Sequence, residues 1–146
     1  MIIDVTGTKS RKLHDYIENV ALYLGLDKFD TWFELAVVKD CDRGAGGYCH
    51  GDDNDIEIEI ARNDRCGKIP MEDLMVNIAH EMIHAQQIAE GRLVNDGFCL
   101  RGEGDEQSLA YAHTWEGEKF YNLPYSDQPW ELEAYSRERE VYEACR

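Results

Sequence analysis

The first regular pattern of apolar positions lies in residues 9–26. Apolar side chains recur there at intervals of three and four residues, which places them on one face of an α-helix. Gly25 follows, and glycine is typical of a helix C-terminus. The pattern predicts an amphipathic helix, and its apolar face consists of Leu13, Ile17, Val20, Ala21 and Leu24.

Two strands are predicted next. Residues 31–40 are rich in aromatic and β-branched side chains, which is typical of a buried strand. Residues 55–62 alternate strictly between apolar and polar, which indicates a half-buried strand. Its two faces hold Ile56, Ile58 and Ile60 on one side and Glu57 and Glu59 on the other. Residues 43–55, between the two strands, are rich in turn formers. We therefore expect the two strands to pair in an antiparallel manner.

A second helix is predicted from Pro70 to about Glu90. Proline is favoured in the first helical turn, and Gly91 marks the end. One side of this helix is apolar, through Leu74, Ile78, Met82 and Ala85. Another side is polar, and it carries Asn77, His80, Glu81, His84 and Gln87. The polar side chains thus gather on a helix that must otherwise be buried.

The pattern of apolar and polar positions is less regular in residues 91–146. Residues 91–128 contain many glycine and charged positions, which predicts loops, with one strand around residues 109–123. Pro129 begins another helical pattern that reaches the end of the sequence. The fold class predicted is α+β, in one domain over residues 1–146, with an N-terminal helix, a small antiparallel sheet and two further helices.

Composition narrows the choice of partners. The chain has 146 residues, about one domain, and 43% are hydrophobic, which is typical of a packed globular protein. Its net charge of −15 disfavours binding to nucleic acid or to an anionic membrane. No segment resembles a signal peptide, and the five cysteines are scattered. We expect a cytoplasmic monomer with reduced thiols.

The second predicted helix carries the sequence H-E-M-I-H at residues 80–84. Histidines four residues apart lie one above the other on a helix, so both imidazoles can reach one ion. Glu81 lies about 100° around the helix from His80. Its carboxylate therefore flanks the ion and can accept a proton from a water. The spacing favours a zinc site with His80 and His84 as ligands and Glu81 as the general base.

A catalytic zinc site usually has a third protein ligand. The last predicted helix begins with P-W-E-L-E-A, which places Glu131 and Glu133 in its first turns. The two carboxylates lie about 200° apart around the helix, so only one can face a given ion. Glu131 lies closer to the apolar side and is the predicted third ligand, with Glu133 as the alternative. Glu131 also has a simpler interpretation, as a negative charge that stabilises the helix N-terminus. His113 has no spacing that links it to the motif.

These two motifs together resemble the gluzincin type of zinc metallopeptidase, in particular its small single-domain members from phages and bacteria. The resemblance implies a minimal zincin-like domain that hydrolyses peptide bonds in a protein or peptide substrate. It implies Zn²⁺ held by His80, His84 and Glu131, with Glu81 as the catalytic base. It also implies an edge strand that pairs with the substrate, and residues 55–62 are the candidate for this strand.

Several points stay open in the sequence. The donor to the oxyanion that forms during hydrolysis is one of four tyrosines, Tyr111, Tyr121, Tyr125 and Tyr135. A zinc-binding regulatory or scaffold protein is one alternative function, although such a protein has no need of Glu81. An acidic protein that mimics nucleic acid is another, but it does not account for the H-E-x-x-H motif.

Overall fold

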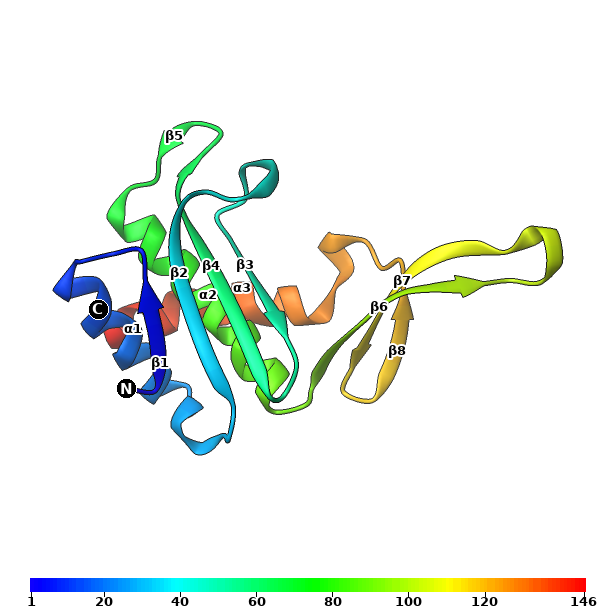
Figure 1. The fold of residues 1–146 in the computed structure, drawn as a ribbon, viewed down its shortest axis with the longest axis horizontal. Coiled ribbons are helices and arrows are strands. Elements are labelled where there is room, and N and C mark those ends of the chain that lie inside the picture. Colours follow the sequence, from blue (N-terminus) through cyan, green and yellow to red (C-terminus); the bar gives the residue numbers. More distant parts are fainter.

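The computed structural model describes all residues, 1–146, as three α-helices and two β-sheets (Figure 1). The helices are α1 (Arg11–Tyr23), α2 (Met71–Ala89) and α3 (Pro129–Cys145). The first sheet contains β1 (Ile3–Thr6), β2 (Trp32–Asp40), β3 (Gly47–Gly51), β4 (Asp55–Asp64) and β5 (Gly67–Lys68). The second contains β6 (Leu93–Arg101), β7 (Ser108–Trp115) and β8 (Glu118–Tyr121). The predicted α+β class is confirmed.

The three predicted helices form close to their expected bounds. The Ser10 hydroxyl accepts a hydrogen bond from the Leu13 amide at 3.3 Å, which caps α1 at its N-terminus. Two glycines with positive φ follow the first two helices, Gly25 at 72° and Gly91 at 74°. This backbone conformation is costly for other residues, so the glycines end both helices where the apolar periodicity ends.

The first sheet differs from the prediction, because it is mixed and not antiparallel. Its strand order is β1-β2-β4-β3, and β1, β2 and β4 run parallel to one another. The predicted antiparallel pairing of residues 31–40 with residues 55–62 is therefore wrong. The reason is β3, which lies in the segment that looked like a turn. After β2 the chain crosses to the edge of the sheet and runs antiparallel to β2 as β3. It then turns back as β4, which lies between β2 and β3.

This topology also corrects the identity of the edge strand. The alternating strand of residues 55–62 belongs to β4, which has a partner on each side, β2 and β3. The two edges of the sheet are β1 and β3, and β3, on the side of β4, pairs antiparallel with β4 along one side only. The alternation of residues 55–62 predicted correctly which side chains of the strand are buried. It carries no information on where the strand lies in the sheet.

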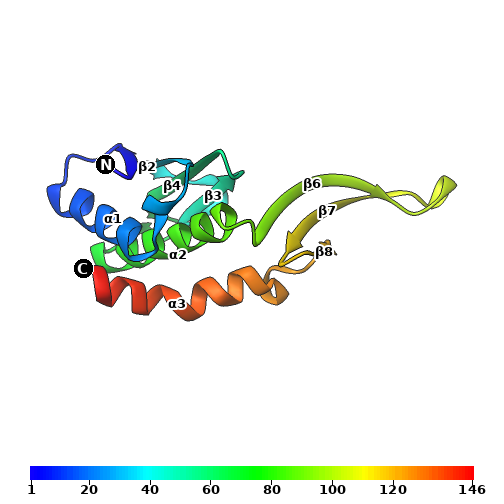
Figure 2. The same ribbon diagram turned by 90° about the horizontal axis from the view of Figure 1, so that it is seen from below.

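All three helices lie on one side of the first sheet, where α3 is separated from the strands by α1 and α2 (Figure 2). Ile56, Ile58 and Ile60 of β4 are fully buried against them, as the alternation predicted. Complete burial of one such side chain stabilises the fold by about 1.5–3 kcal/mol. The carboxylates of Glu57 and Glu59 alternate onto the opposite face, which no helix covers.

Helix α3 packs along α2, and this contact determines the position of the candidate site. Ala134 of α3 is fully buried, and such a small side chain lets two helices approach closely. The Tyr16 hydroxyl of α1 donates a hydrogen bond to the Met75 carbonyl of α2 at 2.6 Å, which fixes α1 to the pair of α2 and α3. The first turn of α3 therefore lies beside the middle of α2.

The second sheet is a curved arm that projects from the body of the protein (Figures 1 and 2). Its strands are antiparallel in the order β6-β7-β8. The predicted strand around residues 109–123 is present as β7 and β8, joined by a turn at Glu116 and Gly117. Strand β6 is not evident in the sequence, because a bulge between Asn95 and Gly97 interrupts its apolar pattern. No helix combines the length and apolar character needed to cross a membrane.

Candidate metal centre

Helix α2 carries both histidines of the H-E-x-x-H motif on the side that faces α3. They lie one helical turn apart, and their Nε2 atoms are 3.2 Å from each other. The exposed fractions of His80 and His84 are 7% and 5%. The two imidazoles thus point at one place from inside the protein, as the spacing predicted.

Glu131 reaches the same place from the first turn of α3. Its Oε1 lies 2.9 Å from Nε2 of His80, and its Oε2 lies 3.0 Å from Nε2 of His84. The three side chains each offer a ligand atom, and these atoms lie within 4.8 Å of one another. The apolar side chain of Trp130, next in the chain, is buried and anchors this first turn.

Glu133, the alternative ligand, lies elsewhere. Arg92 donates hydrogen bonds to both of its carboxylate oxygens, and Arg137 donates a third at 3.0 Å. These contacts join α3 to the start of β6 and leave Glu133 with no part in the histidine cluster. Glu131, which borders the apolar side of the helix more closely, is therefore the carboxylate that lies beside His80 and His84.

The other ring nitrogens of both histidines are bound to acceptors. Nδ1 of His80 donates to Oε2 of Glu138 at 2.8 Å, and Nδ1 of His84 donates to Oε1 of Gln87 at 2.8 Å. Such bonds fix the orientation of each ring and direct Nε2 towards an ion. Gln87 also donates to the Trp130 carbonyl at 3.1 Å, which joins the two helices at this point. Glu138 did not emerge from the sequence, although it follows Glu131 by two helical turns and so shares its face.

The electrostatics show how protons occupy the cluster when no cation is bound. Burial lowers the pKa of His80, but hydrogen bonds with Glu131 and Glu138 outweigh this and raise its pKa to about 9. Burial raises the pKa of Glu131, but the two histidines lower its pKa to about 2. The ordinary pKa values are 6.5 and 4.5. Without a cation, a proton on His80 therefore offsets the negative charge of Glu131. A divalent cation bound to both side chains would replace this proton.

The donor set fits a divalent cation such as zinc. Two imidazole nitrogens and a carboxylate are the ligands of many hydrolytic zinc sites, and a fourth position then remains for water or substrate. The two Nε2 atoms face each other with Glu131 beside both, an arrangement that requires a shared proton or a cation between them. The bonds at both Nδ1 atoms leave each Nε2 as the ring nitrogen available to a cation.

Glu81 lies beside the cluster without joining it. It is half-buried, and no hydrogen bond to a protein group holds its carboxylate. Burial, the largest cause, raises the pKa of Glu81 above its ordinary value, while His84 and His80 act in the opposite direction. A carboxylate with a raised pKa is a better proton acceptor near neutral pH, which suits a general base.

Two glycines of the edge-strand segment bring the backbone close to α2. A Cβ atom on Gly47 would lie 3.1 Å from Cγ of Glu81 and 2.8 Å from the Glu59 carbonyl oxygen. A Cβ atom on Gly46 would lie 2.6 Å from the side-chain nitrogen of Asn77. At position 47 the close atom is a backbone oxygen, so glycine is what leaves room there for β3 to run past Glu81. The sequence showed these glycines merely as turn formers.

Two adjoining hollows open on either side of Glu81. One has a volume of about 420 Å³, and its walls include His84, Tyr111 and His113. The other has a volume of about 290 Å³, and its walls include His80 and Glu138. The two hollows share Ala45, Gly47, Glu81 and Tyr125. The candidate metal centre thus lies between two spaces that border β3 and α3.

The four tyrosines of the sequence have different places. The Tyr125 hydroxyl lies 3.0 Å from Oε1 of Glu131 and 2.8 Å from the Tyr135 hydroxyl. Burial, Tyr135 and Glu131 all raise the pKa of Tyr125, so it keeps its proton at neutral pH. Tyr111 lines the larger hollow, whereas Tyr121 packs beneath Arg101 in the arm, outside both hollows.

His113 lines the larger hollow but is not part of the group that can hold a metal. Its ring packs on Trp130 with the ring centres 4.5 Å apart. Burial lowers its pKa, so the imidazole is neutral at pH 7, and its buried Nδ1 has no hydrogen-bond partner. The sequence offered no signal for its position, because the arm that carries it was only partly predicted.

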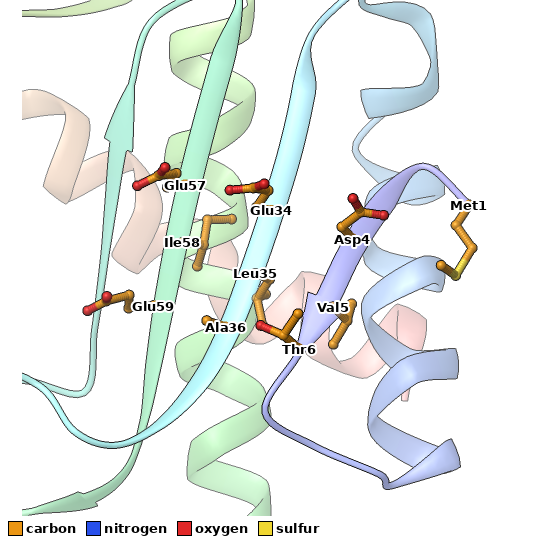
Figure 3. Close-up of a pocket in the computed structure, with 10 residues that line it drawn as sticks. All are labelled: Met1, Asp4, Val5, Thr6, Glu34, Leu35, Ala36, Glu57, Ile58 and Glu59. Atoms are coloured by element: carbon orange, nitrogen blue, oxygen red, sulfur yellow. The ribbon is translucent and has the colours of Figure 1, made fainter.

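A separate cavity of about 500 Å³ lies over β1, β2 and β4. Figure 3 shows Asp4, Glu34 and Glu57 on the near side of these strands, with the helices behind them. Its walls hold carboxylates but no histidine, cysteine or lysine. Glu34 and Glu57 form with Asp55 a second group that could hold a metal, but all three carboxylates are exposed. The centre between α2, α3 and β3 is the group that combines two buried histidines with a carboxylate.

The comparisons with known proteins add no relative to this description. No protein-family model, no curated protein and no solved structure matches the chain.

Proposed function

We propose that this protein is a zinc-dependent peptidase whose centre consists of His80, His84, Glu131 and Glu81. The observation that carries the proposal is the convergence of two imidazoles and one carboxylate, from two helices, beside a free and half-buried glutamate. A purely structural cluster would need the ion pair but not Glu81. The proposal gives each of the four side chains a separate task.

His80, His84 and Glu131 would hold the zinc ion, with Glu138 and Gln87 orienting the two imidazoles. A bound zinc ion would polarise the carbonyl of the scissile peptide bond and lower the pKa of a water molecule. Glu81 accepts the proton of the attacking water and passes it to the amine that leaves. Its raised pKa suits both halves of this transfer, because the group must gain a proton and then release it.

The substrate would lie in an extended conformation along β3. This strand is the edge of the first sheet that lies beside the centre, and its glycines hold it against Glu81. An extended peptide can add to such an edge through backbone hydrogen bonds. Hollows on both sides of Glu81 provide space for residues before and after the cleaved bond. This arrangement favours cleavage within a polypeptide over removal of a terminal residue.

Tyr125 is the residue that we assign to stabilise the oxyanion. It lines both hollows, and its raised pKa keeps its hydroxyl proton at neutral pH. That hydroxyl donates to Oε1 of Glu131 here, and it would have to turn from Glu131 to the oxyanion during hydrolysis. Tyr135 contacts the Tyr125 hydroxyl and supports its position. In this assignment Tyr125→Phe lowers kcat much more than it raises KM, because the donor acts on charge that develops only in the transition state.

The test is hydrolysis of an unfolded protein by the wild-type chain and by Glu81→Gln. The amide keeps the shape of the side chain but cannot accept a proton, so we expect Glu81→Gln to bind zinc and to lose hydrolysis. Glu59→Gln, on the open face of the sheet, makes the same chemical change away from the centre and should behave as wild type. Equal hydrolysis by wild type and Glu81→Gln would refute the proposed base. No hydrolysis by the zinc-loaded wild type would favour a regulatory or scaffold role.

A further inference from the structure

The arm exposes a row of large apolar side chains on one of its faces. Phe98, Leu100 and Leu109 are 69%, 65% and 62% exposed. Leu100 pairs with Leu109 across the two strands, and Phe98 pairs with Tyr111. The rings of Phe98 and Tyr111 meet edge to face with their centres 4.9 Å apart. We call these four residues the arm stripe.

The arm stripe continues directly into the larger hollow of the candidate centre. Side chains at every second position of a strand share a face, so Leu109, Tyr111 and His113 of β7 point the same way. Tyr111 and His113 line the hollow together with Glu81. Leu109 lies four residues beyond His113, which is about 13 Å along the strand. The stripe is thus an apolar track that leads outward from the centre.

The opposite face of the arm exposes less apolar surface, although Val94 and Tyr121 of that face are 44% and 39% exposed. Ala110 and Ala112 lie there and are buried. The guanidinium of Arg101 lies 3.6 Å from the ring centre of Tyr121, and this pair belongs to the same face. The most exposed apolar side chains of the arm therefore lie side by side in the stripe, and such a patch is typical of a surface that binds another molecule.

We propose that the arm stripe binds an apolar stretch of the substrate polypeptide, four or more residues away from the bond that is cleaved. The inference rests on the proposed peptidase function, and it names the class of substrate: unfolded or partly unfolded polypeptides. A folded protein keeps its apolar segments buried, so it cannot offer them to the arm. An unfolded chain can lie along β3 at the centre and continue over the stripe.

A second copy of this chain is a poorer occupant. Each chain has a net charge of −15, so association of two copies is opposed by repulsion. The loop at the tip of the arm adds to this, because it carries Glu103, Asp105 and Glu106. The direct continuity with the hollow favours the substrate, since one bound chain can occupy both surfaces.

The first measurement is binding of an unfolded polypeptide to a chain that cannot cleave it. The probe is fluorescein-labelled lysozyme, reduced and carboxymethylated so that it stays unfolded, and the readout is fluorescence anisotropy. In the Glu81→Gln background, Phe98→Thr, Leu100→Thr and Leu109→Thr together should weaken binding about tenfold or more. Threonine keeps the preference for strand structure. Leu100→Thr alone should cause a smaller loss, and equal zinc content of the variants checks that the fold is kept.

Val94→Thr is the matched control. Val94 is an exposed apolar residue of β6 that pairs with Thr114, so it lies on the face opposite the stripe. This variant should bind the probe as the parent does. Equal binding by the triple variant and the parent, or equal loss in Val94→Thr, would overturn the assignment of the stripe.

Hydrolysis separates the inference from the function on which it rests. With Glu81 intact, the triple variant should lower the ratio of kcat/KM for unfolded lysozyme to kcat/KM for a pool of fluorogenic tetrapeptides. An extended tetrapeptide spans about 14 Å, so when centred on the cleaved bond it does not reach Leu109. An unchanged ratio would overturn the inference. Stripe-dependent binding without any cleavage by wild type would refute the peptidase proposal alone. A wild-type dimer that the triple variant converts to monomer in sedimentation would show self-association and overturn the inference.

Discussion

Replacement of Glu131 by glutamine tests the link between α2 and α3 most sharply. The change keeps the size of the side chain and removes the charge that His80 and His84 share. Glu133→Gln is the matched control, because it makes the same change two residues further along α3, where the partners are Arg92 and Arg137. Only the first substitution alters the candidate ligand set.

The structure gives the size of two effects: the stabilisation of the Glu131 charge and the loss of zinc affinity when this charge is removed. In the metal-free protein the pKa of Glu131 is about 2 instead of 4.5. Because one pKa unit corresponds to about 1.4 kcal/mol, the charge of Glu131 is stabilised by on the order of 3 kcal/mol. Loss of this ligand should weaken zinc binding by more than about 100-fold, which exceeds the usual effect of residues that only orient a ligand. Glu133→Gln should leave zinc affinity unchanged.

The metal-free protein should also show a defined pH dependence. The pKa of His80 is raised from 6.5 to about 9, so its stabilising contribution is complete below pH 6.5 and is lost as the pH rises through 9. The pKa of Glu131 is lowered, so its contribution is complete above pH 4.5 and is lost as the pH falls through 2. Their ion pair therefore stabilises the fold most between pH 4.5 and 6.5.

The assay is thermal and denaturant unfolding at pH 6 and pH 9, with chelator present, together with competition for zinc by a chelator of known affinity. Wild type should lose stability from pH 6 to pH 9 without metal, and Glu131→Gln should lose much less over the same range. Unchanged zinc affinity in Glu131→Gln would refute the ligand assignment. Unchanged pH dependence would refute the ion pair.

Three further predictions concern neighbouring groups. Glu138→Gln should weaken zinc binding by about 10–100-fold, because it removes the carboxylate that orients His80, and a chelator competition with no change would contradict this. Gly47→Ala should keep zinc but lower kcat/KM, since the added Cβ atom presses on Glu81 and on the Glu59 carbonyl; full activity would show that β3 tolerates the displacement. Duplex DNA should bind negligibly at physiological salt because of the net charge of −15, and tight salt-sensitive binding in an anisotropy titration would argue for a different function.

The parts of the fold that depend on local periodicity could be predicted from the sequence. The three helices and the buried face of β4 follow from apolar spacing, and His80, Glu81 and His84 lie together because a helix dictates it. Glu131 could be selected over Glu133 for the same reason, since the apolar side of α3 shows which carboxylate faces inward.

The parts that depend on tertiary packing could not be predicted. Strand β3 is short and begins with a glycine, so its sequence resembles a turn, and its insertion at the edge is what makes β2 and β4 parallel. The hydrogen bond from His80 to Glu138 exists only because two helices far apart in sequence lie side by side. The arm was partly missed because its bulge breaks the alternation of β6.

Zinc stoichiometry and coordination give the most direct test of the central claim. The measurement is metal content of the protein after equilibration with zinc and removal of the excess, followed by X-ray absorption at the zinc edge. The account predicts about one zinc ion per chain, with two imidazole nitrogens at about 2.0–2.1 Å and carboxylate or water oxygen completing the set. His80→Ala, His84→Ala or Glu131→Ala should each abolish stoichiometric binding. Sub-stoichiometric zinc in the wild type, or zinc bound through cysteine sulfur, would contradict the account.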